Sequence, residues 1–150
     1  MLLFILGGCH YLFGDPGSVM PDDTGGACTE IGCTDGVSLD FSLHEPGDYE
    51  ITAVAGGGTV SCTASLPFTG SEACTGPGWI GISGTELPAD QQSIEGMWLE
   101  TIDADDVHLT IVRSGTPLYD DVLPLTYDTV EPNGPDCGPV CESAALTVPL

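Results

Sequence analysis

The chain has 150 residues, of which 41% are hydrophobic, so it is long enough for one domain with a buried core. Asp and Glu total 23 against a single basic residue, Arg113, and the formal net charge at pH 7 is −22. This charge repels nucleic acid and anionic lipid head groups, and the chain lacks the cations that phosphoryl transfer requires. The composition argues against binding of nucleic acid or anionic lipid and against phosphoryl transfer. It is typical of an exported protein with a solvated acidic surface.

The apolar run 1–6 leads into Leu6-Gly7-Gly8-Cys9. This pattern resembles a bacterial lipobox, in which a signal peptide is cut before a cysteine whose sulfur carries a diacylglycerol. On this interpretation residues 1–8 are a signal peptide and Cys9 is a lipid anchor. No Lys or Arg precedes Cys9, and the run is shorter than the roughly 7–15 apolar residues of a secretory signal, so we expect the natural start to lie upstream. The alternative is a cytosolic protein in which Cys9 is an ordinary thiol.

Residues 9–27 follow the anchor and favour a flexible acidic linker. Gly14-Asp15-Pro16-Gly17 and the segment 21–26 combine turn-forming residues with acidic ones, and no apolar periodicity is sustained. We therefore expect one folded domain over residues 28–150.

That domain shows the alternation of apolar and polar residues that is typical of half-buried strands. Gly56-Gly57-Gly58 indicates a hairpin turn and not a phosphate loop, because no lysine follows it. One helical turn is expected within 88–96. Strands are predicted at 37–43, 49–53, 60–66, 79–82, 97–102, 107–111, 118–127 and 144–150. Seven or eight strands predict an all-β fold, an antiparallel β-sandwich of immunoglobulin-like or related Greek-key form.

Seven cysteines leave an odd one in an exported protein. If Cys9 carries the lipid, the other six can form three disulfides. Cys62 and Cys74 bracket a loop rich in Pro, Gly and Thr, and we expect them to pair. The remaining four stand in two clusters near the two ends of the domain: Cys28, Cys33, Cys137 and Cys141.

Cross-pairing of these clusters, Cys28 with Cys137 and Cys33 with Cys141, is favoured because it closes long loops. Two local bridges are the alternative. A zinc site is a third interpretation, but the clusters have four and three intervening residues where two are usual, and disulfides suit an oxidising compartment better.

Candidate catalytic residues are few. The Gly-x-Ser-x-Gly elbow of serine hydrolases is absent from the sequence, and His10, His44 and His108 are each expected at the surface. Trp79 and Trp98 are expected in the core, as is usual in small sandwiches, with exposed binding aromatics as the alternative.

Two acidic groups offer oxygen ligands of the kind calcium prefers. They are Asp103, Asp105 and Asp106, and the pair Asp120 and Asp121. Neither matches the twelve-residue calcium loop, so solvated turns are the main interpretation and no metal site is predicted.

The segments Asp22-Asp23-Thr24-Gly25-Gly26, 28–33 and 132–141 resemble those of small cysteine-containing envelope lipoproteins of unknown function, of the kind predicted in myxobacteria and related bacteria. The resemblance implies location and disulfides, and it implies no catalytic residue.

We therefore expect a non-catalytic protein that is lipid-anchored at the outer membrane or cell surface. Its role would be binding, adhesion or assembly with an envelope protein or glycan, and its contact with the membrane would be through the lipid on Cys9. A calcium- or glycan-binding module is the alternative. A hydrolytic enzyme, which would need His44 or His108 drawn towards acidic residues, ranks third.

Overall fold

The computed structural model describes Cys28 and residues 30–100 and 103–150. Cys9, His10 and the expected signal peptide and linker lie outside these residues. The described residues form ten strands and one 3-10 helix: β1 (Gly36–Leu43), β2 (Gly47–Ala55), β3 (Gly58–Leu66), β4 (Ala73–Thr75), β5 (Gly78–Ser83), η1 (Ala89–Gln91), β6 (Ser93–Leu99), β7 (Asp106–Arg113), β8 (Thr116–Pro124), β9 (Asp128–Val130) and β10 (Cys141–Thr147). A helix long and apolar enough to cross a membrane is not found in this part of the chain.

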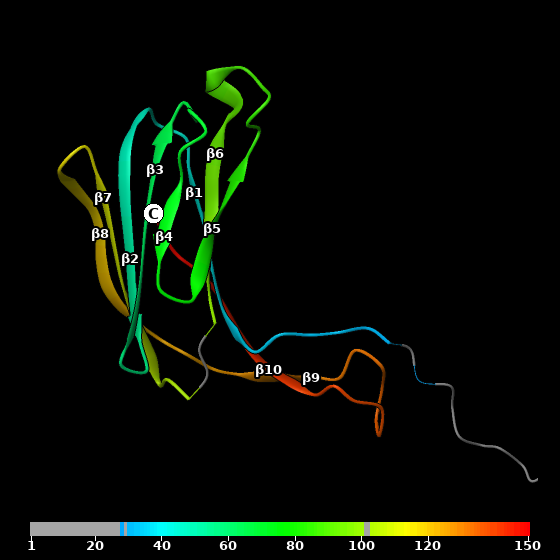
Figure 1. The fold of residues 1–150 in the computed structure, drawn as a ribbon. Helices are drawn as coiled ribbons and strands as arrows, with labels where there is room; N and C mark the ends of the chain where they lie inside the picture. The colour runs from blue at the N-terminus through cyan, green and yellow to red at the C-terminus, as the bar shows by residue number, and fades with distance from the viewer. Residues whose placement is uncertain (1–27, 29, 101–102) are drawn as a thin grey trace, which may run out of the picture.

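The strands form two five-stranded sheets that pack together, which confirms the predicted all-β sandwich (Figure 1). Sheet A has the order β5-β6-β1-β10-β9, and sheet B has the order β4-β3-β2-β7-β8. In sheet B, β7 returns beside β2 after the chain has crossed to sheet A and back. The resulting order β7-β2-β3-β4 is that of a Greek key.

The core lies between the sheets, where alternate residues of the long strands meet. On β1, Val37 and Leu39 are buried while Asp40 is exposed, and β2 and β7 follow the same alternation. The largest fully buried side chains are Leu39, Ile51, Ile94, Leu109 and Ile111. This alternation fixes which face of each strand reaches solvent, and so it fixes the residues that are available for function.

Three details of the predicted fold were wrong. The described residues contain ten strands, not seven or eight, because β4 and β9 are three-residue strands without apolar alternation. The expected helical turn is present at Ala89–Gln91, but the strand after it runs over Ser93–Leu99 and not over the predicted 97–102. One strand pair, β1 with β10, is parallel, so sheet A is not antiparallel throughout.

Three disulfides brace the sandwich: Cys28–Cys137, Cys33–Cys141 and Cys62–Cys74. These are the pairs that the sequence favoured. Cys62 and Cys74 are direct partners on β3 and β4. Because parallel strands begin at the same end, Cys33 ahead of β1 reaches Cys141 at the start of β10. Figure 1 shows the chain ahead of β1 running beside β9 and β10 at one end of the molecule.

Candidate functional site

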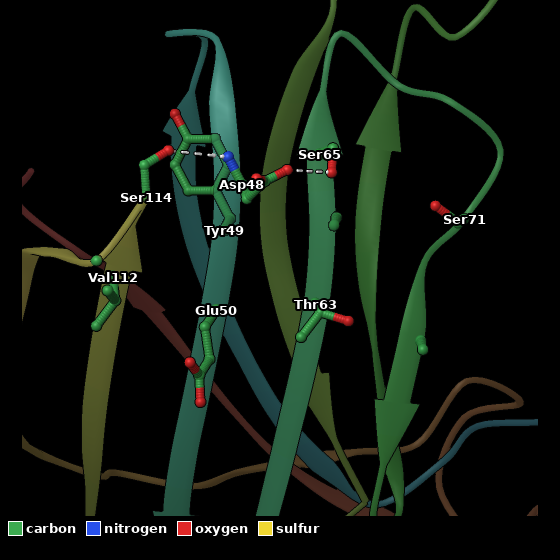
Figure 2. Close-up of a pocket in the computed structure, with 11 residues that line it drawn as sticks. Asp48, Tyr49, Glu50, Thr63, Ser65, Ser71, Val112 and Ser114 are labelled. Atoms are coloured by element: carbon green, nitrogen blue, oxygen red, sulfur yellow. Dashed lines mark hydrogen bonds between the residues drawn. The ribbon is translucent and has the colours of Figure 1, made fainter.

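A pocket of about 570 Å³ lies on the outer face of sheet B (Figure 2). Asp48 and Glu50 reach it from β2, and Thr63 and Ser65 from β3. Ser65 donates a hydrogen bond to Asp48 Oδ1 at 2.7 Å, and the backbone N–H of Asp48 donates to Ser114 Oγ at 3.3 Å. Among the described residues, the lining includes no His, Cys, Lys or Arg, so these residues offer the hydroxyls neither an imidazole base nor a cation.

The second region is the outer face of sheet A, where Trp79 and Trp98 stand side by side. They are direct cross-strand partners on β5 and β6, and their side chains share a face. Trp79 is 57% exposed and Trp98 is half-buried. The expectation that both belong to the core was therefore wrong, because Ile80, Met97 and Leu99 occupy the inward positions on these strands.

Both indole rings lie over glycine backbone, which holds them close to the sheet. A Cβ added at Gly36 would lie 2.5 Å from Trp98 Cζ2. The ring can lie there only because Gly36 has no side chain. The position of a Cβ at Gly81 is 3.9 Å from Trp79 Cζ3 and meets nothing nearer. Each ring is thus supported from beneath, while the pair remains accessible from solvent. We call Trp79 and Trp98 the tryptophan platform.

Two hollows adjoin across sheet A beside the platform. The first, of about 100 Å³, is lined by both tryptophans together with Gly81 and Gly96. The second, of about 380 Å³, is lined by Ser42, Thr147 and Val148. Asp40 and Glu95 line both hollows, so these two carboxylates stand where the hollows meet. We call the combined surface the sheet A groove; it crosses the strands from β5 to β10.

A β-bulge shapes the centre of this groove. The pairing of β6 shifts register between Gly96 and Ile94 against both neighbouring strands, and Glu95 projects outwards at that point. The groove carboxylates already accept hydrogen bonds from hydroxyls, since Ser38 donates to Asp40 Oδ1 at 2.9 Å and Ser93 donates to Glu95 Oε1 at 2.9 Å. An ionised carboxylate offers about four lone-pair sites, so each keeps further capacity to accept.

Of the two described histidines, His44 adjoins the second hollow of the groove and His108 lies on sheet B, and both are exposed. His108 Nε2 is 2.6 Å from Asp120 Oδ1 on the outer face of sheet B. His44 Nε2 is 2.9 Å from Ser42 Oγ at the end of β1, a contact between a base and a hydroxyl that was not predicted from the sequence. In the described part of the chain, no side chain hydrogen-bonds His44 from a third position as the orienting residue of a catalytic triad does.

The candidate calcium ligands lie at the turn into β7. Asp103 and Asp105 are exposed on either side of the buried Ala104, and the carbonyl of Asp105 accepts the backbone N–H of Leu125 at 2.9 Å. Across residues 28, 30–100 and 103–150, no three His, Cys, Asp or Glu side chains are grouped as a metal site. The arrangement of Asp103, Asp105 and Asp106 adds no support for calcium.

No protein-family model, curated protein or solved structure matches this chain. The sheet A groove is the stronger candidate because it combines exposed aromatic rings, a glycine floor and hydrogen-bond acceptors. The alternation in the sequence indicated the exposed tryptophan. Ile80 and Ile82 lie on one face of β5, so Trp79 and Gly81 lie on the other.

Proposed function

We propose that this chain is a non-catalytic, lipid-anchored binding module of the cell envelope, and that the sheet A groove is its binding surface. The observation that carries this proposal is the tryptophan platform. Burying an indole removes some 150–250 Å² of surface from water, and exposed aromatic side chains beside polar groups are typical of interaction sites. Trp79 leaves 57% of its surface exposed, whereas Ile80, the next residue on β5, is buried in the core.

The disulfides support the export part of the proposal. Such bonds persist in oxidising compartments and are rare in the cytosol. The three bridges account for six of the seven cysteines. The seventh is Cys9, the residue that the lipobox pattern assigns to the lipid.

The anchor is tested by the intact mass of the protein purified in detergent from its native cells, before and after reduction and alkylation. We expect a chain that begins at Cys9 and carries diacylglyceryl and acyl groups, with six thiols appearing only after reduction. An unmodified chain with seven free thiols would contradict both the anchor and the compartment.

The binding surface is tested by retention of the soluble domain, residues 28–150 with its disulfides formed, on envelope material washed free of the native protein. We expect Trp79→Ala to lower the retained fraction about tenfold, the result of losing one aromatic contact. Leu118→Ala, which removes an exposed apolar side chain from β8 (40% exposed), is the matched control and should be retained like the parent. Equal retention of parent and Trp79→Ala would refute this surface.

The absence of catalysis is tested at the Ser42–His44 contact. A serine activated as a nucleophile reacts with a fluorophosphonate, whereas an exposed serine hydrogen-bonded to a surface histidine does not. We expect no labelling of Ser42 by mass spectrometry of the treated protein. Labelling that disappears in His44→Ala would revive the hydrolase alternative.

A further inference from the structure

We infer that the sheet A groove binds an uncharged, extended glycan, a chain of β-1,4-linked pyranose rings, with the tryptophan platform stacking against sugar rings and Asp40 and Glu95 accepting their hydroxyls. This inference rests on the proposed binding function and names its ligand class.

The platform fits the apolar face of a pyranose. A sugar ring carries C–H groups on its faces and hydroxyls around its edge, so it packs flat against an aromatic ring and leaves its hydroxyls free to hydrogen-bond. Trp79 and Trp98 are supported from beneath by Gly81 and Gly36, which holds the rings low against the sheet. Strands lie about 4.8 Å apart, so two cross-strand indoles present a surface wider than one ring.

The groove supplies acceptors along the path of such a chain. Asp40 and Glu95 stand between the two hollows, and each already accepts a serine hydroxyl at 2.9 Å. A sugar hydroxyl is the same chemical donor, and a hydrogen bond to an ionised carboxylate is stronger than a neutral one. The groove crosses the strands from Trp79 on β5 to Thr147 on β10, so it suits an extended chain better than a single compact sugar.

The charge of the groove disfavours acidic polysaccharides. The residues that line the groove include no Lys or Arg. Arg113 is on sheet B, where its Nη1 lies 3.8 Å from Glu45 Oε2. An acidic polysaccharide would meet Asp40, Glu95 and a net charge of −22 without a compensating cation. These charges argue against an anionic glycan, and binding of the uncharged glycan that we infer should not depend on salt.

The protein's own fluorescence reports this site directly, because Trp79 and Trp98 are the two tryptophans of the chain. The disulfide-bonded protein is titrated with cellotetraose and with tetra-N-acetylchitotetraose up to about 1 mM, the weak end of specific affinity. We expect at least one of them to produce a saturable change in emission, with the same dissociation constant at low and high NaCl. Tetragalacturonate, the anionic control, should produce none.

Calorimetry with the binding saccharide then tests the residues. We expect Trp79→Ala to weaken binding about tenfold or more, as loss of one stacking contact does. Gly81→Thr should also weaken it, because the new side chain fills the first hollow where a Cβ meets only Trp79. Leu118→Ala should bind like the parent protein. Thermal melting of each variant separates loss of binding from loss of fold.

Three results would overturn the inference. One is saturable binding of tetralysine in place of the neutral saccharides, weakening steeply with salt, which would make the platform a cation site. Another is a saccharide affinity that Trp79→Ala leaves unchanged. The third is an emission that neither saccharide changes, while retention on envelope material still depends on Trp79. In that case the proposed binding function stands without a glycan ligand. If retention is also independent of Trp79, both proposals fall.

Discussion

Tyr119 on β8 has a hydroxyl oxygen that is shielded from solvent and without a hydrogen-bond partner among the described residues. Desolvation, and then the carboxylate of Asp121, raise the pKa of Tyr119 above its ordinary value of 10.0. The folded protein therefore holds this proton more tightly than the unfolded chain does. Above a pH of about 10 the unfolded state loses the proton first, so Tyr119 makes the free energy of unfolding fall as pH rises.

Tyr119→Phe should remove that part of the alkaline loss. At neutral pH it should leave the free energy of unfolding unchanged or raise it by up to about 1 kcal/mol, because an unpaired hydroxyl is deleted. Urea unfolding at pH 8 and above pH 10 measures both effects. Tyr127→Phe deletes the other shielded, unpartnered hydroxyl and is the comparison at neutral pH. An alkaline slope in Tyr119→Phe as steep as in the parent would contradict the assignment.

At the scale of elements, the turn into β5 depends on Gly76. Its φ is +88°, and an added Cβ would overlap the backbone carbonyl of Thr59 on β3. Gly70 has a nearly equal φ of +84° but open space around the same position. Gly70→Ala should cost about 1 kcal/mol for the positive φ alone, and Gly76→Ala at least about 2 kcal/mol more. Denaturant unfolding compares the two, and equal losses would show that the β3 contact does not constrain the turn.

The long strands were predictable because their apolar residues alternate strictly, as Val37, Leu39 and Phe41 do on β1. β4 and β9 were not, because three residues are too few to show a period, and their pairing depends on a neighbour that is already in place. The parallel pairing of β1 with β10 joins the two ends of the domain, and local sequence carries no signal for it.

The candidate site was predictable in part. The face of each tryptophan follows from the strand alternation, which places Trp79 opposite Ile80 and Trp98 between Met97 and Leu99. A general preference of tryptophan for the core led to the wrong prediction, although the local pattern contained the right one. The groove itself could not be predicted from the sequence, because Asp40 and Glu95 are brought together only by the bulged pairing of β1 with β6.

For the whole molecule, the dominant electrostatic fact is a net charge of −22 with one basic side chain. Repulsion among carboxylates disfavours the compact state, and salt screens it over a Debye length that falls from about 30 Å at 0.01 M to about 3 Å at 1 M. The melting temperature at pH 7 should therefore rise by several degrees between these salt concentrations. Near the isoelectric point of about 4.1 the same comparison should show little change. A flat response at pH 7 would mean that the carboxylates are too far apart to repel.

The covalent links at the start of β1 also determine how the domain responds to force. Cys28 and Cys33 both precede β1, and they are bonded to Cys137 and Cys141. A pull on the chain ahead of Cys28 therefore reaches two covalent bridges before it reaches the hydrogen bonds of the first strand. The load divides between β1 and β10, which begin at the same end of sheet A, so β1 cannot be peeled from the sheet alone while the bridges hold. A domain fastened in this way can bear a pull applied ahead of Cys28 without its core opening.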